Sequence, residues 1–233
     1  MDRPKEKVVD VGEYRVNVAN VGSGRPVIML HGIESGSTWK DWDALLPLSD
    51  KYRLVIPDLI GFGKSSRPTE TPDYRGQARL VHDLVEVLKL ERFALAGVSW
   101  GGQVALEVAL GWPGGLDSLV LVSSTYDKAQ LPKLEKVRRP ALIVWAEDDM
   151  VAQLKAGYTL RDALRTSRLE VLAPVAKDPR HDFRIAHRLL LSRGKEVAAI
   201  ARRFLDSPGD SVAEPPELED ELRGMALKRD KEK

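Results

Sequence analysis

The chain of 233 residues contains no cysteine, which excludes disulfide bonds, thiol nucleophiles and thiolate metal sites. No apolar run approaches the roughly 18 to 20 residues that a membrane-spanning helix needs, so no membrane partner is expected. Residues 1–9 are charged and lack the apolar core of a signal peptide. Aromatic residues make up only 6% and no nucleic-acid-binding motif occurs, so nucleic acid is not expected either. Together these absences predict a cytoplasmic protein.

Apolar residues make up 43% of the chain, enough for a large core in one α/β domain. Short apolar stretches alternate with helical ones, which predicts a mainly parallel sheet covered on both faces. We expect strands at 14–21, 27–30, 53–57, 93–97, 118–123, 141–145 and 169–172. The first two are expected to pair as a hairpin across Gly22-Ser23-Gly24.

The most specific motif is Gly97-Val98-Ser99-Trp100-Gly101, which lies between an apolar strand and a stretch of helix formers. A G-x-S-x-G sequence in this setting is typical of a nucleophile elbow, a sharp turn that lifts the serine clear of the backbone. Glycine on both sides is a steric requirement, because a Cβ would collide across the turn. The alternative, Ser99 as an ordinary helix N-cap, does not explain the two glycines.

A nucleophilic serine needs a histidine base and a carboxylate that orients it. In strand–elbow–helix hydrolases these follow the serine in the order acid, then histidine. Only His181 and His187 remain as bases, and Glu147-Asp148-Asp149 supplies acids at the end of a predicted strand. We expect His181, in the loop after strand 169–172, to be the base. His187 is the alternative, although its place on an expected helix favours a solvated side chain.

Residues 10–205 resemble the α/β-hydrolase fold superfamily, as the elbow, the strand ending in His31-Gly32 and the turn at 58–65 indicate. The turn has the family's D-x-x-G-x-G-x-S pattern. The resemblance implies an α/β fold with about eight strands in a mostly parallel sheet. It also implies that the backbone N–H groups of Ile33 and Trp100 form an oxyanion hole, and that His31 shapes its loop.

The resemblance also places the triad acid. Counting from Ala146, which stands where the family has glycine, puts the acid on Asp149, with Asp148 in reserve. The family has glycine before its histidine, whereas this chain has Arg180 before His181. Neither a cofactor nor a metal is expected, because no further ligands accompany the acidic triplet. His82, on a helical stretch, is expected at the surface.

Many relatives carry a cap domain after the strand that here ends near residue 123, whereas only residues 126–140 precede the next strand. We therefore expect no substantial cap and an open site, which favours simple acyl hydrolysis over chemistry that needs a sealed cavity. Glu34 and Tyr126, in the two loops that would wall the pocket, are the expected substrate-binding residues. Glu34 is expected to disfavour substrates with negative charge near the acyl group.

Positive charge is in excess over residues 151–205 and negative charge over 206–233. The first pattern is typical of solvated helix faces; alternatively, Arg180, Arg184 and Arg188 attract a distal anionic group of a substrate. We expect a catalytic domain over 1–205. Residues 206–233 are expected to form a charged tail with one short helix at 217–228.

The expected function is a serine hydrolase that cleaves small carboxylic esters or thioesters through an acyl-enzyme, using Ser99, His181 and Asp149. A carbon–carbon bond hydrolase, a peptidase or a perhydrolase on the same triad is the alternative. A binding protein that keeps the fold without catalysis is the third possibility. Haloalkane dehalogenases and epoxide hydrolases place aspartate at the elbow, so Ser99 argues against both.

Overall fold

The computed structural model describes residues 3–174 and 184–210 of the chain. Eight strands form a single sheet in the order β1-β2-β4-β3-β5-β6-β7-β8. From β4 to β8 in this order every neighbouring pair is parallel, while β2 runs antiparallel to both of its neighbours, β1 and β4. The strands are β1 (Lys5–Val11), β2 (Tyr14–Val21), β3 (Arg25–Leu30), β4 (Tyr52–Pro57), β5 (Phe93–Val98), β6 (Leu116–Val122), β7 (Ala141–Ala146) and β8 (Ser167–Leu172).

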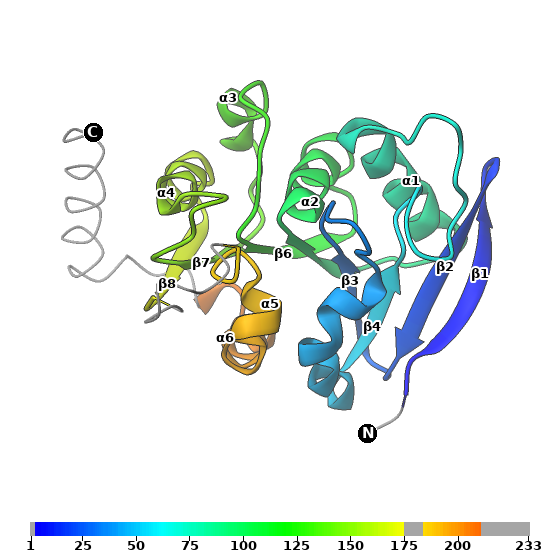
Figure 1. Cartoon of the computed structure of the whole chain (residues 1–233), viewed down its shortest axis with the longest axis horizontal. Coiled ribbons are helices and arrows are strands. Elements are labelled where there is room, and N and C mark those ends of the chain that lie inside the picture. The colour runs from blue at the N-terminus through cyan, green and yellow to red at the C-terminus, as the bar shows by residue number, and fades with distance from the viewer. Residues whose placement is uncertain (1–2, 175–183, 211–233) are drawn as a thin grey trace.

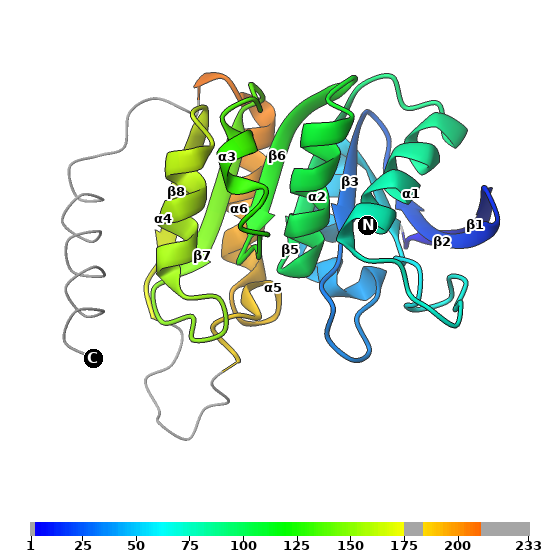
Figure 2. The same ribbon diagram turned by 90° about the horizontal axis from the view of Figure 1, so that it is seen from above.

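Helices cover both faces of the sheet, as Figures 1 and 2 show. On one face lie α1 (Tyr74–Val87), α2 (Trp100–Gly111), α3 (Leu131–Leu134) and α4 (Leu154–Ala163). On the other lie the 3₁₀ helix η1 (Trp39–Asp50), α5 (Leu189–Ser192) and α6 (Gly194–Asp206). Because parallel strands with helices on both faces are buried on both sides, β5 and β7 are buried along their whole length.

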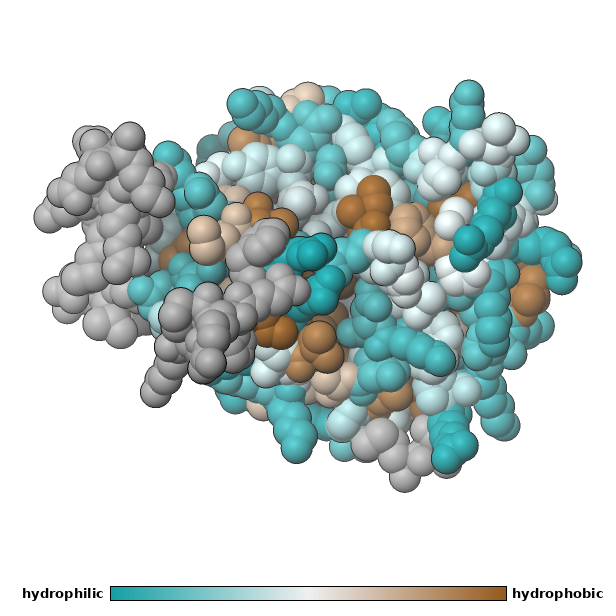
Figure 3. Space-filling view, viewed as in Figure 1, coloured by the Kyte–Doolittle hydropathy of each residue, from teal (hydrophilic) through white to brown (hydrophobic). Residues whose placement is uncertain are grey.

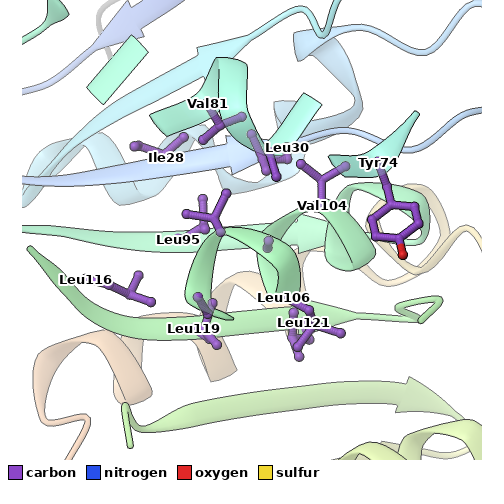
Figure 4. Packing of buried hydrophobic residues seen from close by; sticks show 14 of the residues in the cluster. Ile28, Leu30, Tyr74, Val81, Leu95, Val104, Leu106, Leu116, Leu119 and Leu121 are labelled. Atoms are coloured by element: carbon purple, nitrogen blue, oxygen red, sulfur yellow. The ribbon is translucent and has the colours of Figure 1, made fainter. Parts of the chain in front are cut away.

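Two apolar cores follow from this layering. One lies between the sheet and α1, α2 and α4, and the other between the sheet and η1, α5 and α6. Figure 4 shows the first, in which Val81 of α1 and Val104 of α2 face Ile28, Leu95 and Leu119 on the strands. The face of the molecule drawn in Figure 3 is mostly hydrophilic and carries only small apolar patches.

The predicted α/β fold, with eight strands in a mostly parallel sheet, is confirmed. The predicted hairpin of 14–21 with 27–30 is wrong, because β4 lies between β2 and β3 and pairs with both. Gly22 and Gly24 have positive φ and carry the chain past the start of β4, where a Cβ on either residue would collide with the β4 backbone or with the residue before it. Strand β1 was not predicted; it is an edge strand whose first four residues are exposed.

The absence of a substantial cap is confirmed for the described part of the chain: between β6 and β7 the only helix is α3, four residues long. Helix α4 begins at Leu154, and the residues between β7 and α4 form a loop. His82 is half-buried and stacks on Trp112, with the ring centroids 5.0 Å apart. No helix in residues 3–174 or 184–210 is long and apolar enough to cross a membrane. The helix predicted at 217–228 lies outside the described residues.

Candidate active site

Ser99 lies at the turn between β5 and α2, with φ +52° and ψ −119°. This left-handed backbone is rare for a residue with a side chain and is maintained by the surrounding contacts. The Ser99 N–H donates to the Val122 carbonyl, and the Ser99 carbonyl accepts from the N–H groups of Gly102 and Thr125. A Cβ on Gly97 would collide with the Gly101 carbonyl, and one on Gly101 would collide with the Leu30 carbonyl. The structure therefore contains the strained turn that the glycine spacing predicts.

Asp149 lies in the loop after β7 and is 4% exposed. Its Oδ1 accepts hydrogen bonds from the N–H groups of Val151 and Ala152, both at 2.9 Å. Its Oδ2 is 2.9 Å from Nδ1 of His187. Of the two acids considered, the structure thus places Asp149 against His187.

His187 lies in the turn just before α5 and is 5% exposed. Its Nε2 is 2.9 Å from Oγ of Ser99, so a single hydrogen-bonded line joins Ser99, His187 and Asp149. The expectation of a solvated His187 is wrong. His181, predicted as the base, lies outside the described residues, and the position expected for it is taken by His187. We therefore replace His181 by His187 as the candidate base.

A signal for His187 was present in its neighbours. Ala186, Leu189 and Leu190 are apolar and buried, whereas residues 177–182, around His181, are almost all charged or proline. A base that bonds to a buried carboxylate must itself be covered by apolar side chains. His181 was predicted instead because it lies in the loop that follows the strand at 169–172.

The expected oxyanion donors lie on either side of the serine. Trp100 is the first residue of α2, so its N–H has no acceptor inside the helix. Gly32 passes close to the elbow: a Cβ built on it would lie 3.5 Å from Cβ of Ser99. The next residue, Ile33, is exposed. The two segments that carry the proposed donors therefore border Ser99, and helix α2 directs its positive end toward the site.

His31 ties this region to the neighbouring loop, as expected for a loop-shaping residue. Its ring is fully buried; Nδ1 bonds the Gly32 carbonyl at 2.7 Å and Nε2 accepts from the Leu59 N–H at 2.9 Å. This pair of bonds assigns the proton to Nδ1, and burial lowers the pKa of His31. Asp58, in the D-x-x-G-x-G-x-S turn, accepts from the Trp39 N–H and so holds the far end of the loop that begins at Gly32.

A cavity of about 320 Å³ opens beside Ser99 and His187. Its walls include Glu34, Asp41, Arg188, Leu190 and Leu191. Tyr126, the other expected substrate-binding residue, lines a separate cavity of about 430 Å³ together with Met150 and Lys155. Of the two expected substrate-binding residues, the structure therefore places only Glu34 in the wall of the cavity that contains Ser99.

The three arginines considered as an anion-attracting face have different surroundings. Arg188 is paired with Glu34, with Nε and Nη2 both 2.8 Å from Oε2 of that carboxylate. The backbone carbonyl of Arg184 accepts a hydrogen bond from the Arg188 N–H. Arg180 lies outside the described residues. Across residues 3–174 and 184–210, no three His, Cys, Asp or Glu side chains are placed to hold a metal ion.

Known proteins with similar sequences and structures share the fold of this chain. A family profile described as "alpha/beta hydrolase fold" matches residues 25–139. A solved serine hydrolase involved in carbazole degradation superposes with a TM-score of 0.76 at 19% identity, covering 87% of this chain and 99% of that one. The chain belongs to the α/β-hydrolase fold superfamily.

Curated members of the superfamily with similar sequences have different activities. A 2-hydroxy-6-oxo-2,4-heptadienoate hydrolase of Pseudomonas putida is 34% identical over 122 residues, which is 51% of this chain and 44% of that enzyme. A fluoroacetate dehalogenase of a Burkholderia species is 33% identical over 124 residues, 51% of this chain and 40% of that enzyme. The chain spans less than half the length of these two relatives.

Proposed function

We propose that this α/β-hydrolase is a serine hydrolase of carboxylic esters and related acyl compounds, with Ser99 as nucleophile, His187 as base and Asp149 as the orienting acid. One observation carries the proposal: the two hydrogen bonds of 2.9 Å that place His187 between Ser99 and Asp149. This is the arrangement that a serine needs in order to lose its proton as it attacks. A binding protein would have no use for the strained backbone at Ser99.

The reaction begins when Oγ of Ser99 attacks the carbonyl carbon and Nε2 of His187 takes the hydroxyl proton. Asp149 stabilises the imidazolium and keeps Nδ1 protonated. The N–H groups of Ile33 and Trp100 donate hydrogen bonds to the carbonyl oxygen and stabilise the negative charge that develops on it. His187 then gives its proton to the leaving alkoxide, and an acyl-serine remains. A water molecule, deprotonated by His187, releases the acid and restores Ser99.

The surroundings of the site favour apolar substrates of modest size. The cavity of about 320 Å³ is at the small end of the range for ligand pockets, which suits short to medium acyl groups. Leu190 and the exposed Leu191 line this cavity, and the exposed Ile33 follows Gly32, another residue of its wall. The Glu34–Arg188 pair carries no net charge and Asp41 adds a further carboxyl group to the wall, so a neutral ester fits better than an anionic one.

The test is hydrolysis of a series of p-nitrophenyl esters by the wild type and by Ser99→Ala, with fluorophosphonate labelling of both. We expect turnover and labelling in the wild type, and a loss of roughly a million-fold in kcat for Ser99→Ala. If the wild type were labelled by fluorophosphonate but did not hydrolyse the esters, Ser99 would still be a competent nucleophile, and carboxylic esters would be rejected as its substrates. Absence of both would reject the proposed function.

A second candidate is a carbon–carbon bond hydrolase on the same triad. It is favoured by the similarity to the 2-hydroxy-6-oxo-2,4-heptadienoate hydrolase, whose named substrate presents a ketone rather than an ester. Assay of such a dienoate beside the esters separates the two candidates, since the preferred substrate has the higher kcat/KM.

A further inference from the structure

Two segments far apart in the chain carry the two halves of the proposed active site, and the role inferred below for the contact between them rests on the proposed function. Ile33, a proposed oxyanion donor, lies on the loop after β3, whereas the proposed base His187 lies 154 residues later in the turn before α5. The next residue in each segment, Glu34 and Arg188 respectively, forms an ion pair with the other. We term this ion pair the Glu34–Arg188 bridge.

We propose that the Glu34–Arg188 bridge is a positioning device, which holds the oxyanion loop and the base turn at the spacing that catalysis requires. Both guanidinium contacts, from Nε and from Nη2, are 2.8 Å long and converge on Oε2 of Glu34. Such a two-nitrogen contact restricts orientation as well as distance. Both residues also line the cavity that contains Ser99 and His187, so the bridge forms part of its wall.

Each end of the bridge is anchored close to a proposed catalytic group. The Glu34 carbonyl accepts from the Ser37 N–H in a turn where Gly36 has φ +87°, so Glu34 moves with its loop. Arg188 donates its N–H to the Arg184 carbonyl, and its own carbonyl accepts from Leu191 and Ser192. A shift at either end is therefore transmitted to the adjacent Ile33 or His187.

Electrostatics agree with a Glu34 carboxylate directed toward the cavity. Burial raises the pKa of Asp41, another residue of the cavity wall, and the negative charge of Glu34 raises it further. Arg188 offsets that charge locally. Because both side chains of the bridge are about one-third exposed, the pair contributes little to global stability, and its effect is expected mainly on geometry.

The test is a double-mutant cycle on the full chain with Glu34→Gln, Arg188→Gln and the double variant. On a neutral p-nitrophenyl ester we expect each single variant to lower kcat about tenfold, below the roughly hundredfold loss that a 1 Å misplacement can cause. KM and Tm should change little, and the double variant should be no worse than either single one. Glu135→Gln, which breaks the exposed Arg165–Glu135 pair, is the matched control and should leave kcat unchanged.

Hydrogen–deuterium exchange provides a readout that does not depend on turnover. Glu34→Gln and Arg188→Gln should each speed amide exchange in both segment 32–38 and segment 184–192. Glu135→Gln should leave exchange in both segments unchanged. Exchange confined to the mutated segment, or kcat losses that multiply in the double variant, would overturn the proposal. If the wild type neither hydrolyses esters nor reacts with fluorophosphonate, the proposed function fails, while the exchange result still decides the bridge.

Discussion

The elbow that carries Ser99 and the turn that carries His187 meet at one hydrogen bond, yet they are built in opposite ways. The elbow is specified within a few residues, because Gly97 and Gly101 are needed where a Cβ would strike backbone atoms. The turn at 184–187 has no such local requirement. Its histidine is placed by partners 38 and 88 residues away, Asp149 and Ser99.

This contrast shows that the nucleophile and the base are encoded at different distances along the chain. Strain at Ser99 comes from covalent geometry and can be recognised in a short motif. The position of His187 depends on how α5 and α6 pack on the sheet, which places the preceding turn over the end of β7. We expect substitutions in the two regions to differ accordingly.

The largest effect is expected at the two histidines. His187→Ala should lower kcat roughly a million-fold, because the serine then has no base, whereas His181→Ala should leave it within experimental error. Steady-state ester hydrolysis by both variants measures this. If His181→Ala abolished hydrolysis and His187→Ala did not, His181 would be the base and the contrast between the elbow and the turn at 184–187 would be wrong.

The second effect concerns the acid that orients His187. Asp149→Asn should lower kcat about 10⁴-fold, because an amide no longer favours the productive tautomer of the imidazole. Asp148→Asn, one residue away, is the control and should lose far less. Circular dichroism should show both variants folded. Equal losses would mean that the acidic loop acts as a whole rather than through Asp149.

The third effect is on stability at the elbow. Gly101→Ala should lower the free energy of unfolding by about 1–3 kcal/mol, since its Cβ collides with the carbonyls of Leu30 and His31. Gly111→Ala, at the far end of the same helix, meets nothing within 4 Å and should be neutral or slightly stabilising.

In helix α5, which follows the turn that carries His187, Leu191→Ser should change the free energy of unfolding by no more than about 0.5 kcal/mol, because this side chain is 72% exposed. Urea unfolding of these variants compares the two regions directly. A cost at Leu191 equal to that at Gly101 would remove the contrast in stability between them.

The smallest effect is a pH dependence from His31, next to the elbow. Burial lowers its pKa in the folded state, so the unfolded chain takes up the proton first as the pH falls below about 6.5. Stability should therefore be lost on acidification from about pH 6.5 and be unaffected by His31 above it. Unfolding of the wild type and His31→Gln between pH 7.5 and 5.5 measures this: the variant, although less stable, should show a shallower decline.

Much of the fold was predictable because its strands are short, continuous apolar runs buried on both faces. The strands β5, β6 and β7 were placed to within about two residues on that basis. The order of the strands was not predictable from proximity, since β2 and β3 are neighbours in sequence but are separated by β4 in the sheet. The charged edge strand β1 had too weak an apolar pattern to be recognised.

Three features could be predicted from the sequence: the elbow, the position of Ser99 within it and the lack of a substantial cap between β6 and β7. Each depends on steric rules or on the length of a connecting segment. The three-dimensional packing was needed to establish that His187 contacts Ser99, that Asp149 and not Asp148 contacts His187, and that Arg188 pairs with Glu34. These contacts join segments far apart in the chain. Their geometry is set by the packing of helices on the sheet. The apolar neighbours of His187 indicate that it is buried, but they do not indicate which residues it contacts.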